Sequence, residues 1–162
     1  MVTGTTVGAR DAVAAVPDPE LPLGTIEELG ILRSVSVDPE TGRVTVAIMP
    51  TYLGCPALET IRADVVTALG QAGYENVEVM TVLRPAWSTD MITESGRAKL
   101  AAAGIAPPSP TRAGPVPLRL SVVCPRCGSS DTEELSAFGS TACKALWRCR
   151  ACREPFERVK PL

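Results

Sequence analysis

The sequence contains no histidine among its 162 residues. This absence excludes the Ser-His-Asp triad, the Cys-His pair, HExxH zinc sites and the two-His facial triad of non-haem iron enzymes. Any catalysis would depend on cysteine, a carboxylate, lysine, tyrosine or a bound cofactor. The composition therefore argues against an ordinary hydrolase.

Aromatic residues are also scarce, at 4% of the chain, whereas hydrophobic residues make up 45%. The core must therefore be built mainly from Leu, Ile, Val and Ala. No apolar run approaches the ~20 residues that a membrane-spanning helix needs, and the N-terminus shows no basic segment followed by an apolar one, as a secretory signal would. We therefore expect a cytoplasmic protein with no membrane partner.

Charge is unevenly distributed along the chain. Residues 1–115 carry 8 basic and 13 acidic side chains, whereas residues 116–162 carry 8 basic and 5 acidic ones. The basic density of the second part is too low, and aromatics are too sparse, for a nucleic-acid-binding surface. Between the two parts, residues 106–117 hold five of the fifteen prolines, which predicts an extended linker. The expected domains are residues 1–105 and residues 118–162, joined by this linker.

Hydrophobic periodicity in the first domain predicts an α+β fold, a two-layer sandwich with helices on one face of a small sheet. Thr25 and Glu28 have the spacing of a capping box around a single turn that Gly30 ends. Alternating residues on both sides of a Pro/Gly turn predict an antiparallel hairpin. The expected elements, in order, are helix 9–15, strands 34–37 and 43–48, helix 56–69, strand 77–83 and helix 88–103.

Five of the six cysteines lie in the second domain. Two Cys-x2-Cys pairs supply four thiolates in the pattern of a tetrahedral metal ribbon. The pairs are Cys124 with Cys127 and Cys149 with Cys152. No water-bearing ligand position is evident, so we expect a structural metal that holds together a hairpin too small to fold on its apolar core alone. Zinc is the expected ion, and iron or an iron–sulfur cluster would use the same ligands.

Cys143 is the fifth cysteine of this domain, and it has two interpretations. It is either a small apolar residue that faces Phe138 or Trp147, as free cysteines often are, or an alternate ligand that lets the metal exchange.

Cys55 lies apart from the others, at the expected start of helix 56–69. A helix N-terminus stabilises a thiolate when the sulfur is accessible, so Cys55 is either a reactive thiol or a partly buried capping residue. Asp18 and Glu20 lie in a proline-rich turn. They are either solvated turn acids or carboxylates near Cys55 that bind metal or relay a proton.

Several segments together carry a resemblance to a known family. The first two resemble the iron–sulfur assembly domain of SufT-like proteins, and the set as a whole is similar to the PaaD (PaaJ) family of phenylacetyl-CoA epoxidase accessory proteins. The segments are VPDPELP (16–22), MPTYLGCPALETIRADV (49–65), LRPAWSTDMITESGRAKLAAAGIAPP (83–108) and the cysteine-rich stretch 124–162. The likeness covers about residues 10–162, so only the first nine residues fall outside it.

This resemblance implies a non-catalytic role in phenylacetate catabolism, in which the protein helps to install or repair metal cofactors. The implied partners are the epoxidase subunits and their iron–sulfur flavoprotein reductase. Cys55 corresponds to the assembly-domain cysteine, and Asp18 to the acidic residue of that domain. One thiolate cannot retain a cluster, so a transiently held iron or cluster would need a second Cys55 in a homodimer, Cys143 or a client protein.

Three other functions compete with this interpretation. The chain could be a structural subunit of the oxygenase, with the ribbon as docking module. A zinc-ribbon nucleic-acid binder is disfavoured by the charge pattern. A thiol oxidoreductase centred on Cys55 lacks a nearby resolving cysteine.

Overall fold

The computed structural model describes residues 5–21, 23–108 and 122–161. The chain divides into two compact units, one of Met1–Trp87 with Met91–Thr93 and the other of Ser88–Asp90 with Glu94–Leu162. Each unit has its own sheet and its own buried residues, and each is described by itself. In the part of the chain that is described, no helix combines the length and the apolar character needed to cross a membrane.

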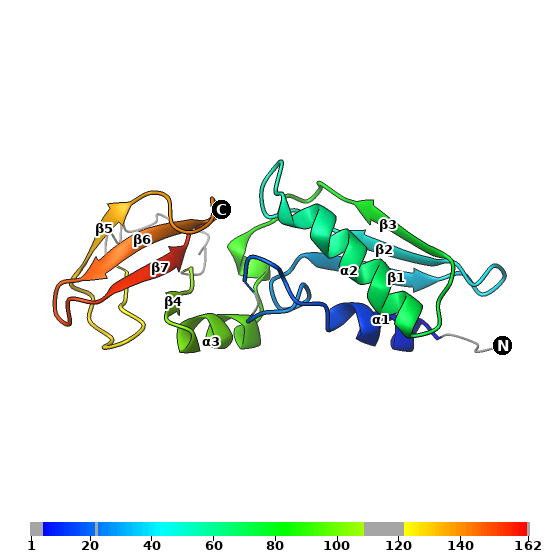
Figure 1. The fold of residues 1–162 in the computed structure, drawn as a ribbon, viewed down its shortest axis with the longest axis horizontal. Coiled ribbons are helices and arrows are strands. Elements are labelled where there is room, and N and C mark those ends of the chain that lie inside the picture. Colours follow the sequence, from blue (N-terminus) through cyan, green and yellow to red (C-terminus); the bar gives the residue numbers. More distant parts are fainter. Residues whose placement is uncertain (1–4, 22, 109–121, 162) are drawn as a thin grey trace. The chain divides into compact units, whose positions relative to one another are not determined.

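The N-terminal unit contains a three-stranded sheet of order β1-β2-β3. Strands β1 (Leu32–Val37) and β2 (Val44–Ile48) are antiparallel, which confirms the predicted hairpin. Strand β3 (Val77–Thr81) runs parallel to β2, and helix α2 (Ala57–Gln71) makes the crossover between them. Helix α1 (Thr6–Ala14) contacts both α2 and the sheet, so the two helices form one layer over it (Figure 1).

The core of this unit lies between α2 and the central strand. Helix α2 buries Ile61, Val65 and Leu69 at four-residue spacing, so that these side chains share one face. Strand β2 buries Val44, Val46 and Ile48, each with no exposed surface. Each such side chain contributes about 1.5–3 kcal/mol of transfer free energy when it is fully buried. Aliphatic residues thus supply this core, as the scarcity of aromatics requires.

The turn at residues 25–30 forms the predicted capping box. Glu28 N–H donates to Thr25 Oγ1 at 3.2 Å, and Thr25 N–H donates to Glu28 Oε2 at 3.1 Å. Gly30 then adopts a left-handed backbone conformation with φ of +71°. A Cβ atom on Gly30 would lie 2.7 Å from the carbonyl oxygen of Met91. The turn and the segment around residue 91 therefore approach so closely that only glycine fits.

The C-terminal unit contains a four-stranded sheet of order β4-β7-β6-β5. Strands β5, β6 and β7 form an antiparallel meander, and the short β4 adds to β7 in parallel. Helix α3 precedes β4, and a 3₁₀ turn, η1, precedes α3. The bounds are η1 Thr89–Met91, α3 Glu94–Ala102, β4 Ile105–Ala106, β5 Thr132–Ser136, β6 Lys144–Cys149 and β7 Pro155–Val159.

The division between the units differs from the boundary expected after residue 105. The helix predicted over 88–103 is broken into η1 and α3, and α3 belongs to the C-terminal unit. The physical reason is β4, because Ala106 pairs with Arg158 of β7 and lies in the same buried cluster as Trp147 and Phe156. Residues 109–117 of the predicted linker lie outside the described residues.

We predict that Gly30→Ala lowers the free energy of unfolding by about 2–5 kcal/mol, the sum of left-handed strain and forced overpacking against Met91. Urea unfolding followed by circular dichroism measures this change. Gly42→Ala is the matched control, because Gly42 has φ of +68° but no atom lies within 4 Å of the position that its Cβ would take. The control should lose only about 1–2 kcal/mol. Equal losses in the two variants would contradict the close approach.

Candidate functional site

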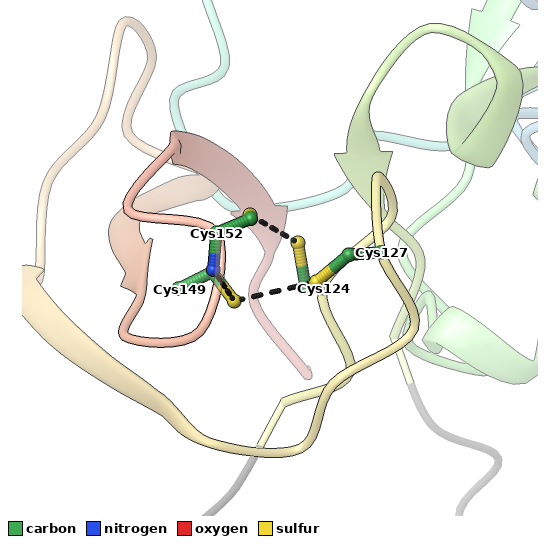
Figure 2. A group of neighbouring side chains, drawn as sticks. All are labelled: Cys124, Cys127, Cys149 and Cys152. Atoms are coloured by element: carbon green, nitrogen blue, oxygen red, sulfur yellow. Dashed lines mark hydrogen bonds between the residues drawn. The ribbon is translucent and has the colours of Figure 1, made fainter.

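Four cysteine sulfurs converge at one end of the ribbon. Cys124 Sγ lies 3.8 Å from Cys152 Sγ, and Cys127 Sγ lies 3.6 Å from Cys149 Sγ. All four sulfurs lie within 4.8 Å of one another. Figure 2 shows the two Cys-x2-Cys loops facing each other with their thiols pointing inward. The structure thus brings together the four ligands that the sequence predicted.

Backbone hydrogen bonds shape both loops. In the first, Cys124 N–H donates to Ser129 O and Gly128 N–H donates to Cys124 O, both at 2.9 Å. Gly128 closes this loop with φ of +73°. In the second, Cys149 N–H donates to Glu154 O at 3.0 Å, and Arg153 takes the left-handed conformation with φ of 65°. Both loops therefore reverse the chain direction through a residue in the left-handed conformation, which is Gly128 in the first loop and Arg153 in the second.

Without a bound cation, the thiols of Cys149 and Cys152 differ widely in pKa. The Cys152 N–H donates to Cys149 Sγ at 3.5 Å, and this bond is the main cause that lowers the pKa of the Cys149 thiol to about 7. For Cys152, the N–H of Glu154 lowers the pKa, but burial and the neighbouring thiols outweigh it and raise the pKa to about 12. Four thiols this close cannot all ionise unless a cation neutralises their charge.

The donor set fits a tetrahedral metal ion. Zn–S bonds of about 2.3 Å place the sulfurs of a tetrahedron about 3.8 Å apart, which matches the 3.6 and 3.8 Å separations. Cys124 and Cys149 are buried, and only Cys127 is exposed. The four sulfurs fill the shell, so the arrangement is that of a closed structural site rather than a catalytic one with an open position.

An ion-pair cluster beside the metal loops was not predicted from the sequence. Glu133 of β5 accepts hydrogen bonds from Arg148 and, at 2.8 Å, from Arg150. Arg150 first, and then Arg148, lowers the pKa of the Glu133 carboxyl. Glu133 and Arg148 are directly paired across β5 and β6. The sequence does contain opposite charges on the two adjacent strands. To predict the ion pair from them requires the strand register, which the sequence pattern alone does not give.

Cys143 does not join the sulfur cluster. It directly precedes β6, whereas Cys149 ends that strand. Six residues of extended chain span about 20 Å. The Cys143 side chain is buried, and its Sγ lies 3.1 Å from Thr141 Oγ1. The structure therefore places this thiol at the opposite end of the strand from the metal loops.

Cys55 lies in the loop between β2 and α2, one residue before the helix N-cap, Pro56. Its N–H donates to Tyr52 O and its carbonyl accepts from Leu58 N–H, both at 3.3 Å. The side chain is half-buried, and the neighbouring Leu53 is 81% exposed. The loop thus holds Cys55 by its backbone at the helix start, as predicted, beside an exposed apolar side chain.

The two predicted acids differ in their surroundings. Asp18 is only 5% exposed, and its Oδ1 accepts the N–H groups of Glu20 and Leu21 at 2.8 and 2.7 Å. This carboxylate therefore shapes the turn that it sits in. Glu20 is half-buried. Within the residues that the structure describes, Asp18, Glu20 and Cys55 do not form a group of metal ligands as the four cysteines do.

The fold and the sulfur cluster define the class of this protein: a small α+β domain of the iron–sulfur assembly type, followed by a metal-binding β-ribbon. Residues 9–81 match the family described as iron-sulfur cluster assembly protein. Residues 109–160 match the PaaD zinc beta ribbon domain. The chain is also 44% identical, over 91% of its length and 88% of the relative's, to a protein of Escherichia coli (strain K12) that is named as a subunit of "Putative 1,2-phenylacetyl-CoA epoxidase". The chain therefore belongs to the PaaD family, as its sequence motifs indicated.

Two solved structures resemble about three fifths of this chain. A DUF59 domain from Bacillus anthracis has a TM-score of 0.53 and 28% identity, and the match covers 59% of this chain and 90% of that one. A conserved hypothetical protein from Thermotoga maritima has a TM-score of 0.51 and 27% identity, with coverage of 62% and 98%. These likenesses support the α+β fold.

We predict that Cys127→Ser abolishes stoichiometric metal binding and unfolds the ribbon. Cys127 is exposed, so the substitution removes a ligand without disturbing a packed side chain. Elemental analysis after dialysis against a chelator measures the bound metal, and tryptophan fluorescence follows the two tryptophans, of which Trp147 lies in the ribbon core. Cys143→Ser is the matched control and should keep its metal. Full metal retention by Cys127→Ser would show that the four-sulfur assignment is wrong.

Proposed function

We propose that this chain is a non-enzymatic accessory protein of a phenylacetyl-CoA epoxidase system and assists the assembly of its iron or iron–sulfur cofactors. The proposal is carried by the presence of an assembly-type domain and a PaaD ribbon in one chain. The same chain matches the epoxidase relative from Escherichia coli over 91% of its length. The proposed partners are the epoxidase subunits and their iron–sulfur flavoprotein reductase, and the proposed location is the cytoplasm.

Zinc is the metal that we assign to Cys124, Cys127, Cys149 and Cys152. A closed shell of four thiolates is typical of structural zinc. The ribbon core is small, and two of its seven buried residues, Cys124 and Cys149, are ligands themselves. A bound ion would therefore supply much of the folding free energy of this unit. The ribbon is then a static module and not the carrier of the assembled cofactor.

The thiol proposed to take part in assembly is Cys55. It is separate from the four-sulfur cluster, half-buried, and held at a helix start by two backbone hydrogen bonds. Since one thiolate cannot retain a cluster, the remaining ligands would come from a client protein or from the Cys55 of a second copy. Cys143 fits this role poorly, because it is buried beside Thr141. Asp18 would act by shaping its turn, and Glu20 remains a candidate acid.

A second function has a specific observation in its favour. The relative's name describes a subunit, and a subunit can be a lasting structural part of an assembly. In that case the ribbon would serve as the docking module, and Cys55 would have no chemical role. The two functions make opposite predictions for a Cys55 variant.

We predict that the protein, purified without oxygen, contains one zinc ion per chain and no acid-labile sulfide. Elemental analysis, a sulfide assay and the visible spectrum measure this directly. Iron together with sulfide in the four-cysteine site would contradict the assignment of a static zinc ribbon.

We also predict that Cys55→Ser lowers the iron content of the epoxidase complex to that of a strain lacking this protein. Serine keeps the size of the side chain, so the fold should survive. Iron analysis of the oxygenase and reductase subunits, together with turnover of phenylacetyl-CoA, measures the effect. Cys143→Ser is the matched thiol control and should leave both unchanged. Full iron loading and activity with Cys55→Ser would refute the assembly role and favour the structural subunit.

A further inference from the structure

The connection between β5 and β6, residues 137–143, is held by an ion pair between a buried lysine and a half-buried glutamate. Lys144 Nζ lies 3.0 Å from Glu157 Oε2, and the Lys144 side chain is only 6% exposed. The other carboxylate oxygen of Glu157 accepts the N–H of Ser140 at 2.5 Å. Burial alone would raise the pKa of Glu157, but the Ser140 N–H and the Lys144 ammonium together lower it. The carboxylate is therefore ionised and anchors the loop.

Further contacts fix the backbone of the 137–143 loop on both sides. Gly139 N–H donates to Lys144 O at 2.8 Å, and a Cβ on Gly139 would lie 2.7 Å from the Glu157 carboxylate. Lys160, which follows β7, donates its N–H to Cys143 O at 2.9 Å and its ammonium to Ala137 O at 3.0 Å. A loop that only connects two strands does not need a buried lysine, whose ammonium group is costly to desolvate.

This fixed loop presents a large apolar side chain to solvent. Phe138 is 69% exposed, and the Lys160 ammonium lies 4.7 Å from the centre of its ring. The chain has only two phenylalanines, and the other, Phe156, is buried in the ribbon core. An aromatic side chain on a fixed backbone makes an effective binding anchor, because little backbone conformational entropy remains to be lost when the ring enters a pocket.

We propose that Phe138 is the anchor through which this protein docks onto another protein, a subunit of the phenylacetyl-CoA epoxidase complex. The partner surface is an apolar pocket with carboxylates at its rim. The apolar pocket follows from the exposed ring, and the carboxylates follow from the Lys160 ammonium that lies over that ring. This inference rests on the proposed function, because it takes the epoxidase complex as the partner.

The test measures binding of the full-length, metal-loaded protein to the purified epoxidase complex by biolayer interferometry. Phe138→Ala should weaken the affinity about tenfold or more, as truncation of a central anchor does. Phe138→Trp should restore most of the affinity, because it keeps an aromatic ring on the same loop. Lys160→Gln should weaken binding less, with a smaller salt dependence.

The matched control is Val7→Ala, which truncates a side chain of similar exposure, 70%, on helix α1. It should bind as the wild type does. Metal content and the thermal transition of Phe138→Ala should equal those of the wild type, because the ring is mostly exposed. A Phe138→Ala variant that binds within about twofold of wild type would overturn the proposal, since so small a change lies below hot-spot effects.

The iron content of the complex separates this proposal from the proposed function. If Phe138→Ala loses binding while Cys55→Ser leaves iron loading intact, docking stands and the assembly role fails. If Cys55→Ser lowers iron loading while Phe138→Ala binds normally, the assembly role stands and the docking proposal fails. Failure of the wild type to bind the complex overturns the docking proposal. So does a Phe138-dependent affinity for anionic vesicles or single-stranded oligonucleotides in place of the complex.

Discussion

The convergence of four sulfurs from two short loops is the constraint on which the C-terminal unit depends. Its buried cluster contains seven residues, among them Cys124 and Cys149, so the core and the ligand set overlap. Neither β5 nor β7 offers a long apolar face of its own, because β5 has no fully buried residue and β7 buries only Phe156 and Val159. A cation that neutralises the thiolates would fix both loops and, through them, the meander that connects them. The N-terminal unit has no such dependence, because its core is an aliphatic layer between α2 and β2.

The cysteines of the two units therefore differ in role. Four thiols face one another within 4.8 Å, as expected of ligands to one ion. Cys143 is a small buried residue beside Thr141, at the far end of β6. Cys55 alone is half-buried in the assembly-type domain, next to the exposed Leu53. The cysteine thiols of a chain without histidine thus lie in three distinct environments.

Local signals in the sequence predicted much of this architecture. The Thr25–Glu28 capping box, the hairpin of β1 and β2, helix α2 and the paired Cys-x2-Cys loops each follow from residues that are close together in sequence. The sequence did not reveal the parallel pairing of β4 with β7 or the ion pairs of Glu133 and Glu157. These contacts join residues far apart in sequence, so their energies depend on a register that no local pattern encodes. The position of α3 in the C-terminal unit was missed for the same reason.

The pairing of β4 with β7 also bears on where this chain can be cut. The family match for the ribbon begins at residue 109, after β4 has ended at Ala106. A fragment cut at that match would lose the strand that covers β7, and β7 would become an open edge with unpaired N–H and C=O groups. Such edges recruit strands from other molecules and promote aggregation. The two residues of β4 therefore cover part of the β7 edge of the sheet. A fragment that contains the ribbon should include them.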